Sequence, residues 1–358
     1  MSVSAGEIGI RKTTLHLGQR SLPTRHGEFV VHFFRDLARN QTSMAVVFGA
    51  LDGSSPLLAR VHSSCLTSEC LMGRDCDCAE QLGGALATMA RAGEGVLFYL
   101  MQEGRGAGLT AKARDRMIVQ ASGNRITTFE AYAEMGLPSD LRRYDAVAPM
   151  SRLLGIRAPI RLLTNNPDKA AAVAKTLAEE EIEVCRTEPI QGPISVFNSD
   201  YLSAKHDSGH ALNRPARNAP IEGALPPERV RILPPVVLPG EPNRILTASY
   251  FLPVAVPASH GEQGSDFVDW FRLSVVFDCK TARESVVLAH PGSSVTDVVV
   301  AATEIAEGEE SVSMSLLDRL PVGHAPGREA LTAALQNIHA RGRGSVAIQF
   351  DDRERAER

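Results

Sequence analysis

One short stretch, RVHSSCLTSECLMGRDCDC, constrains this chain more than any other feature. It runs from Arg60 to Cys78 and holds four of the six cysteines in the chain, with Cys65, Cys76 and Cys78 in a C-x10-C-x-C array. A catalytic zinc ion takes three protein ligands and leaves one position open for water, whereas a structural zinc ion closes its shell with four. The spacing therefore predicts an open, catalytic zinc site.

The same cysteines could instead be small core side chains, because cysteine is among the most buried residue types. The residues between and around them include Arg, Asp and Glu, which suit an apolar core poorly and favour metal binding. Residues 77–92 have apolar side chains at helical spacing, so a helix is expected there. Its positive end would favour thiolates at Cys76 and Cys78.

A glycine-spaced turn, QEGRGAGL, follows the apolar run over residues 95–100, which predicts a buried strand. The turn leads into the helix-like sequence AKARDRMIVQ. Glycines there let the backbone approach a ligand closely, and Lys112, Arg114 and Arg116 add positive charge suited to phosphate.

Five motifs in order, RVHSSCLTSEC, CDCAEQL, QEGRGAGL, GLPSDLRRY and RLLTNNPDK, resemble GTP cyclohydrolase II. This zinc enzyme opens the guanine ring of GTP at the head of riboflavin synthesis. The resemblance runs from about Leu22 to Leu212. It implies a mixed-sheet α/β core, one zinc ion on Cys65, Cys76 and Cys78, Mg²⁺ with the triphosphate, release of formate and pyrophosphate, and a homodimer.

The resemblance also implies roles for individual residues. Asp140 would accept a proton, and Arg142 would either attack the α-phosphate or stabilise its transition state. We favour stabilisation, because a guanidinium is a poor nucleophile. The implied nucleotide site comprises Arg60, His62, Ser63, Ser64, Gln81, Glu103, Gly104, Arg105, Thr128, Thr164 and Lys169.

Three positions depart from the family pattern. Asp75 stands where the family has arginine, Arg116 where it has tyrosine, and Thr127 where it has aspartate, unless the local alignment is shifted. A carboxylate accepts from both N1–H and the exocyclic amine of guanine, which a threonine cannot do. Two alternatives therefore stay open: a paralogue that opens another base, such as the pyrimidine of UTP, or stops at a formylated intermediate, and a catalytically degenerate nucleotide-binding regulator.

Composition narrows the functional classes. The chain has 358 residues, 22% of them charged, and a net charge of −4, which does not suit a nucleic-acid surface. There is no leader-like N-terminus and no apolar run of membrane-spanning length, so we expect a cytoplasmic protein without a membrane partner. Cysteines crowded into one stretch make a disulfide framework a poor interpretation.

The expected organisation has four parts: a loosely ordered start (1–20), the zinc catalytic domain (21–212), a Pro-rich linker (213–242) and a small α/β domain of unknown role (243–358). In the catalytic domain we predict a hairpin from strands 29–34 and 43–48, a strand over 57–62, and a strand, turn and helix from residue 160. In the last part we predict strands near 245–256, 271–277 and 345–350, and helices from Ser294 and over 327–340.

Overall fold

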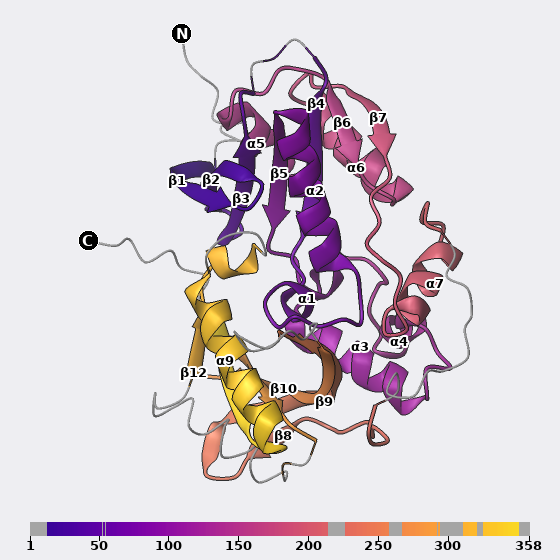
Figure 1. The fold of residues 1–358 in the computed structure, drawn as a ribbon. Helices are drawn as coiled ribbons and strands as arrows, with labels where there is room; N and C mark the ends of the chain where they lie inside the picture. Colours follow the sequence, from indigo (N-terminus) through magenta and orange to yellow (C-terminus); the bar gives the residue numbers. More distant parts are fainter. Residues whose placement is uncertain are drawn as a thin grey trace.

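The computed structural model describes residues 13–51, 53, 55–213, 226–257, 267–291, 293, 311–320 and 325–350. Over these residues the chain forms two mixed β-sheets with helices packed against them, so the fold is mixed α/β, as predicted. Figure 1 shows the two sheets at opposite ends of the molecule, with α3 near the junction between them. None of the helices in the described ranges is long and apolar enough to cross a membrane.

The first sheet has seven strands in the order β1-β2-β3-β5-β4-β6-β7. Strands β1, β2, β3 and β5 pair antiparallel, and β5, β4, β6 and β7 pair parallel. The predicted hairpin is confirmed as β2 and β3. The bounds are Thr14–Thr24 (β1), Gly27–Asp36 (β2), Gln41–Phe48 (β3), Leu57–Ser63 (β4), Gly95–Leu100 (β5), Ile160–Leu163 (β6) and Val184–Glu188 (β7).

Local sequence explains where the helices beside this sheet begin and end. α2 ends at Gly93, whose φ of 81° is the left-handed conformation that glycine adopts without strain. α6 begins after Asn166, whose side chain accepts from the Lys169 backbone N–H, and has Pro167 in its first turn. The bounds are Leu66–Glu69 (α1), Cys78–Ala92 (α2), Leu109–Ala121 (α3), Thr128–Glu134 (α4), Val147–Leu153 (α5), Pro167–Ala178 (α6) and Ser199–Asp207 (α7), with a 3-10 turn at Gly104–Gly106 (η3).

The second sheet has six strands in the order β12-β13-β11-β10-β9-β8, and Figure 1 shows α9 lying along it. The strands and helix predicted near residues 245–256, 271–277, 327–340 and 345–350 are confirmed. The bounds are Val236–Leu238 (β8), Glu241–Val256 (β9), Phe267–Asp278 (β10), Arg283–Ala289 (β11), Ser311–Met314 (β12), Ser345–Phe350 (β13) and Pro326–Arg341 (α9), with a 3-10 turn at Leu317–Arg319 (η4).

The second sheet shares a hydrophobic core with α1 and α3. Leu66 of α1 and Leu109, Ala113 and Met117 of α3 belong to the same buried cluster as the apolar side chains of β9, β10, β11 and β13. The side chain of Gln120 also donates to the Phe251 carbonyl (2.6 Å) and accepts from the Phe251 backbone N–H (2.9 Å). The second sheet is thus packed, through α3, onto the part of the chain that forms the first sheet.

Two further contacts join the part of the chain that forms the first sheet to the part that forms the second. The loop before Cys76 pairs with β9: the Arg74 N–H donates to the Pro253 carbonyl (2.8 Å), and the Ala255 N–H donates to the Met72 carbonyl (2.9 Å). Elsewhere the ring of Phe197 packs edge-on against Trp270 of β10, with the ring centroids 5.9 Å apart.

The N-terminal stretch and the Pro-rich linker both contain strands, which the sequence did not predict. β1 begins at Thr14, inside the stretch expected to be loosely ordered, because its backbone pairs with β2 along its whole length even though most of its side chains are exposed. The expected linker contributes β8 and the start of β9. β8 is an edge strand, where neighbouring prolines are tolerated. The helix predicted from Ser294 lies outside the described residues.

Candidate metal and nucleotide site

The candidate site lies at the carboxyl ends of parallel strands β5, β4 and β6. In open α/β sheets this edge is the usual place for ligands, because the loops that follow neighbouring strands converge there. Strand β4 carries Arg60 and His62 and leads to Cys65, β5 leads to Glu103, and β6 leads to Thr164. Cys76 and Cys78 arrive from the start of α2.

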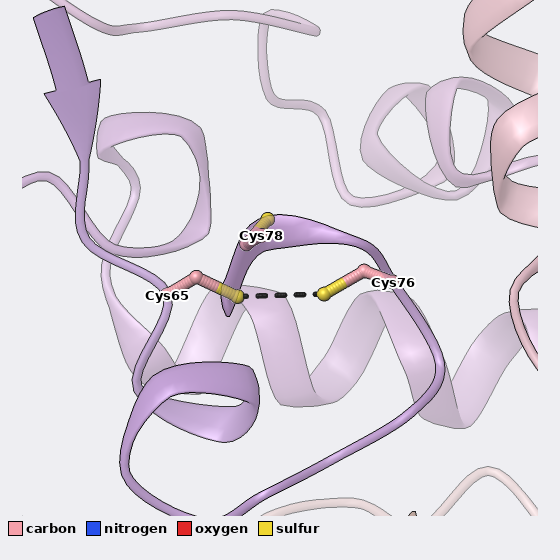
Figure 2. Close-up of side chains that lie close together, drawn as sticks. All are labelled: Cys65, Cys76 and Cys78. Carbon is pink, nitrogen blue, oxygen red and sulfur yellow. Dashed lines mark hydrogen bonds between the residues drawn. The ribbon is translucent and has the colours of Figure 1, made fainter. Parts of the chain in front are cut away.

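The three predicted metal ligands lie together, as Figure 2 shows. Their sulfur atoms all lie within 4.8 Å of one another, and the Sγ atoms of Cys65 and Cys76 are 3.6 Å apart. Cys65 and Cys76 are buried and Cys78 is half-buried. Among the described residues, no fourth His, Cys, Asp or Glu joins this group.

A lysine stabilises the thiolate form of Cys65. Lys112 Nζ donates to Cys65 Sγ (2.9 Å) and to Glu103 Oε1 (2.9 Å). Hydrogen bonds from Cys76 and Cys78, together with the Lys112 charge, hold the pKa of Cys65 well below its ordinary value. Three sulfur ligands, one of them on the wall of a cavity, fit a zinc ion, since thiolates bind this metal and three protein ligands are typical of catalytic sites.

Next to Cys78 lies a cavity, called here the first cavity, whose walls carry many cationic side chains. It contains ten of the predicted site residues and seven that the sequence analysis had not assigned to a site. Its lining consists of Arg60, His62, Ser63, Cys78, Gln81, Arg105, Phe129, Asp140, Arg142, Thr164, Asn165, Asn166, Lys169, Tyr201, Lys205, His210 and Leu212.

Four predicted nucleotide-binding residues lie away from this lining. Ser64 and Glu103 line a second cavity, of about 670 Å³, between the first sheet and the second. Gly104 is buried, and its carbonyl accepts from the Tyr132 hydroxyl (2.7 Å). The buried Thr128 hydroxyl donates to Asp115 Oδ2 (2.8 Å).

Sequence reasoning missed Tyr201, Lys205 and His210 as site residues. Lys205 Nζ lies 3.3 Å from Oδ1 of Asp77, the residue between the paired cysteines. Burial and the surrounding cations lower the pKa of His210 to about 4, so its imidazole is neutral at neutral pH. The segment YLSAKHDSGH resembles the closing motif of the family, and this was the available signal for these residues.

Two cations of the first cavity are deeply buried. Arg60 donates to the Leu163 carbonyl (3.1 Å) and to Gln81 Oε1 (2.6 Å). Lys169 Nζ donates to the Val61 carbonyl (3.2 Å), and burial with the charges of Arg142, Arg60 and Lys205 holds its pKa well below the ordinary value. An anion entering the cavity would relieve this repulsion.

Asp140 and Arg142 form an ion pair in the cavity lining. Arg142 Nε donates to both carboxylate oxygens, at 2.9 and 3.1 Å. Although burial alone would raise it, these bonds hold the pKa of Asp140 below its ordinary value. The same pair raises the pKa of Arg142, so the guanidinium stays protonated. Asp140 caps no helix, because it lies in a loop between α4 and α5.

His62 is held by the buried carboxylate of Glu69, which in turn accepts a hydrogen bond from Tyr99. Its Nε2 lies 2.7 Å from Glu69 Oε1, and the Tyr99 hydroxyl donates to the other oxygen of that carboxylate. Burial lowers the pKa of His62, which favours the neutral ring. The other ring nitrogen, Nδ1, is buried and has no hydrogen-bond partner.

Comparison with known proteins shows to which family the chain belongs. The sequence model of GTP cyclohydrolase II matches residues 16–189. The GTP cyclohydrolase-2 of Shewanella sediminis is 38% identical over 199 residues, which cover 55% of this chain and 93% of the relative. The corresponding enzyme of Shewanella oneidensis is 37% identical over 199 residues, covering 55% of this chain and 94% of the relative. The chain belongs to the GTP cyclohydrolase II family. The family consists of hydrolytic enzymes, so the chain is an enzyme of the cyclohydrolase class.

A solved structure was also matched, a two domain 3,4-dihydroxy-2-butanone 4-phosphate synthase from A. baumannii. It is 17% identical, with a TM-score of 0.27, and the match covers 51% of this chain and 41% of that one. A likeness this low carries no argument about fold or function.

Two departures from the GTP cyclohydrolase II pattern contact each other. Asp75 Oδ2 lies 3.4 Å from Arg116 Nε, and the Arg116 guanidinium stacks over the Tyr201 ring, 4.7 Å from its centroid. Together they form one buried ion pair beside the cysteines.

The third departure, Thr127, lies outside the first cavity. Its exposed side chain caps α4 by accepting from the Glu130 N–H, while Glu130 accepts from the Thr127 N–H, which is a complete capping box. In this structure Thr127 holds a helix end rather than facing the cavity.

Proposed function

We propose that this protein is a zinc-dependent GTP cyclohydrolase that opens the imidazole ring of the guanine base and releases formate and pyrophosphate. The observation that carries the proposal is that the cysteine cluster and the cationic first cavity meet at Cys78. Cys78, one of the three clustered cysteines, lines the cavity whose walls also carry Arg60, Arg105, Arg142, Lys169 and Lys205. Thiolates suited to zinc and cations suited to a triphosphate share one space.

A zinc ion held by Cys65, Cys76 and Cys78 would supply Lewis acidity and an activated water for attack on the base. The cations of the cavity bind and orient the phosphates, with Mg²⁺ sharing their charge. The neutral His62, fixed by Glu69, lines the same cavity and keeps its second ring nitrogen without a hydrogen-bond partner in the protein.

Asp140 and Arg142 suit the phosphate step. Asp140 is ionised at neutral pH and can accept a proton from an attacking water. Arg142 remains protonated and stabilises the charge that develops on the α-phosphate. We assign Arg142 this electrostatic role because a guanidinium with a raised pKa has no lone pair for attack.

The remaining site residues are assigned by the family pattern. Ser63, Gln81, Arg105 and Thr164 line the first cavity and would contact the nucleotide, whereas Ser64, Glu103, Gly104 and Thr128 would support its walls. A homodimer in the cytoplasm is also part of the proposal. Light scattering of the purified protein tests the dimer.

The deciding experiment offers the zinc-loaded protein GTP, ATP, UTP or CTP with Mg²⁺. Products are identified by mass spectrometry, with separate assays for formate and pyrophosphate. GTP turnover with both products is expected. Ring opening of UTP without formate would replace guanine by a pyrimidine, and nucleotide binding without any turnover would indicate a regulator.

A further inference from the structure

The three cations of α3, which the sequence suited to phosphate, lie away from the first cavity. None of Lys112, Arg114 and Arg116 belongs to its lining. Arg114 Nη1 donates to the Thr247 carbonyl of the second sheet (2.9 Å), and Arg116 pairs with Asp75. Lys112 reaches the cysteine array, so its part in the site runs through a metal ligand.

Lys112 bridges a sulfur atom and a carboxylate. Its Nζ lies 2.9 Å from Cys65 Sγ and 2.9 Å from Glu103 Oε1. The side chains of Lys112 and Glu103 are only 11% and 10% exposed. Hydrogen bonds between charged groups are short and strong, and water competes little for partners buried this deeply. The ammonium is therefore held beside the sulfur.

Glu103 fixes both sides of this contact. While Oε1 accepts from Lys112, Oε2 accepts from the backbone N–H of Leu66 (2.5 Å), the residue that follows Cys65. Oε1 also accepts from the Gly104 N–H (3.1 Å). One carboxylate thus ties together the ammonium, the backbone after the metal ligand and the glycine turn. The family resemblance implied a nucleotide contact for Glu103, whereas its hydrogen bonds point to a role at the cysteines.

The glycine turn leaves room for this lysine. Gly104 has a φ of 58°, and a Cβ atom there would lie 3.2 Å from Lys112 Cβ and 3.4 Å from the Lys112 backbone nitrogen. The sequence predicted that glycines in this turn let the backbone approach a ligand closely. At Gly104 the close approach is to the lysine that bonds Cys65.

We propose that Lys112 and Glu103 are positioning residues of the metal site. Lys112 holds the Cys65 sulfur through an N–H···S hydrogen bond, and Glu103 fixes Lys112 and the backbone beside that sulfur. Three thiolates with a divalent cation carry a net negative charge, which the nearby ammonium offsets. Outer partners of this kind orient the ligands and tune the metal. The inference rests on the metal site of the proposed function.

The test titrates Co²⁺ into the metal-free, full-length protein and follows the thiolate-to-metal absorption bands. Lys112→Met should weaken Co²⁺ affinity about 10- to 100-fold. The bands should move to longer wavelength, because the sulfur lone pairs lose the hydrogen bond that stabilises them. Zinc affinity, measured by competition with Co²⁺, should fall by a similar factor.

A second variant separates the action at sulfur from the ion pair. Glu103→Gln keeps an oxygen for the Leu66 N–H but removes the charge that holds the ammonium, so a smaller shift in the same direction is expected. Lys112→Met alone leaves a buried carboxylate unpaired and should lose stability. The double variant should regain that stability and still match Lys112→Met in affinity and bands, because Glu103 acts through Lys112.

Arg114→Met is the matched control, since it removes a cation of the same helix that bonds the second sheet. It should lower the unfolding midpoint without changing the cobalt bands or the metal affinity. Wild-type bands and affinity in the folded double variant would overturn the proposal. An equal shift in Arg114→Met would overturn it too, because the effect would then follow from stability alone.

Kinetics distinguish a role at the metal from a role at the nucleotide. Because Lys112 does not line the first cavity, Lys112→Met should lower kcat for GTP about 10- to 100-fold with KM nearly constant. A raised KM with unchanged kcat would refute the proposal. If the wild-type protein loads Co²⁺ but turns over no nucleotide, the proposed reaction fails while the titrations still decide the role of Lys112. A wild-type protein that binds no metal would refute both.

Discussion

At the scale of single residues, Asp77 shows how the cysteine motif is more than a ligand set. Its side chain is fully buried, Gln81 donates to its Oδ2 (2.6 Å), and Lys205 lies at its Oδ1. Gln81 in turn accepts from Arg60. Asp77 thus holds two cations of the first cavity in place: Lys205 directly, and Arg60 through the Gln81 amide.

Cys76→Ser should abolish zinc binding and turnover while leaving the fold largely intact, because serine is a poor zinc ligand of similar size. Metal analysis, circular dichroism and the turnover assay check this. The matched control is Cys70→Ala, which removes a buried thiol outside the array, whose pKa burial raises to about 12. Full activity in Cys76→Ser would refute the metal assignment.

Thr127→Asp should leave both stability and base preference nearly unchanged, since aspartate also caps helices well. Thr127→Ala should cost about 1 kcal/mol of stability through loss of the cap, again with no change of base preference. Denaturant unfolding and competition between GTP and UTP test the pair. A gain in GTP preference for Thr127→Asp would mean that this position reads the base after all.

Nucleotide binding should take up a proton at Lys169. In the free protein its pKa lies well below the ordinary 10.5, and phosphate charge raises it again. At a pH between the pKa of Lys169 in the free protein and its pKa in the nucleotide complex, the amine is neutral in the free protein and charged in the complex. Nucleotide affinity therefore falls as pH rises through this window. Calorimetry in buffers of different ionisation enthalpy measures the uptake, which Lys169→Met should remove. Proton release on binding would contradict the assignment.

At the scale of elements, the loop before Cys76 depends on close packing against β9. A Cβ atom on Gly73 would lie 2.6 Å from the Thr67 carbonyl oxygen and 2.8 Å from a methyl carbon of Leu252. The first neighbour is backbone and cannot move aside. The position therefore requires glycine for space, although its φ is ordinary.

Gly73→Ala should destabilise the protein by about 1–3 kcal/mol through overpacking and weaken zinc affinity, because the displaced loop carries Cys76. Gly83→Ala is the control: it lies within α2, where an added Cβ meets nothing within 4 Å. That change should be neutral or stabilising by about 0.5–1 kcal/mol. Equal zinc affinity in wild type and Gly73→Ala would show that the contact does not shape the site.

The sequence predicted what depends on local pattern. The strands and helices beside the cysteines follow from periodicity, and the spacing of Cys65, Cys76 and Cys78 predicted a cluster that the fold does form. The capping role of Thr127 was also visible in the sequence as T-x-x-E, but the comparison with the family drew attention to the missing aspartate instead.

The docking of the second sheet against the loop before Cys76 could not be predicted. It depends on β9 meeting a loop about 180 residues earlier in the chain, through backbone hydrogen bonds that leave no mark in the side-chain pattern. For the same reason Ser64 and Glu103, which belong to site motifs by sequence, line the second cavity instead of the first. Sequence order places motifs in the right region but does not decide which way each side chain faces.

At the scale of the whole molecule, the shared core makes the two sheets one folding unit. A fragment ending at residue 212 would expose apolar side chains of α1, of the loop after it and of α3, including Leu66, Leu71, Leu109 and Met117. Exposed patches of this kind drive association. The family match, in contrast, ends at residue 189, before the second sheet begins.

The intact protein should therefore unfold in a single calorimetric transition, and the fragment 1–212 should aggregate or unfold at a markedly lower temperature. Scanning calorimetry and light scattering of both proteins provide the comparison. A monomeric fragment with full stability and zinc content would show that the second sheet is dispensable for the core.

The edge-on contact between Phe197 and Trp270 has a practical consequence. Trp270 is the one tryptophan in the sequence, and it lies in the second sheet while its aromatic neighbour, Phe197, lies in the loop between β7 and α7. Indole fluorescence from the unmodified enzyme therefore has a single source, located where the halves meet. Its emission wavelength and quenching give a label-free optical record of whether the two sheets stay together during metal loading, nucleotide binding or turnover.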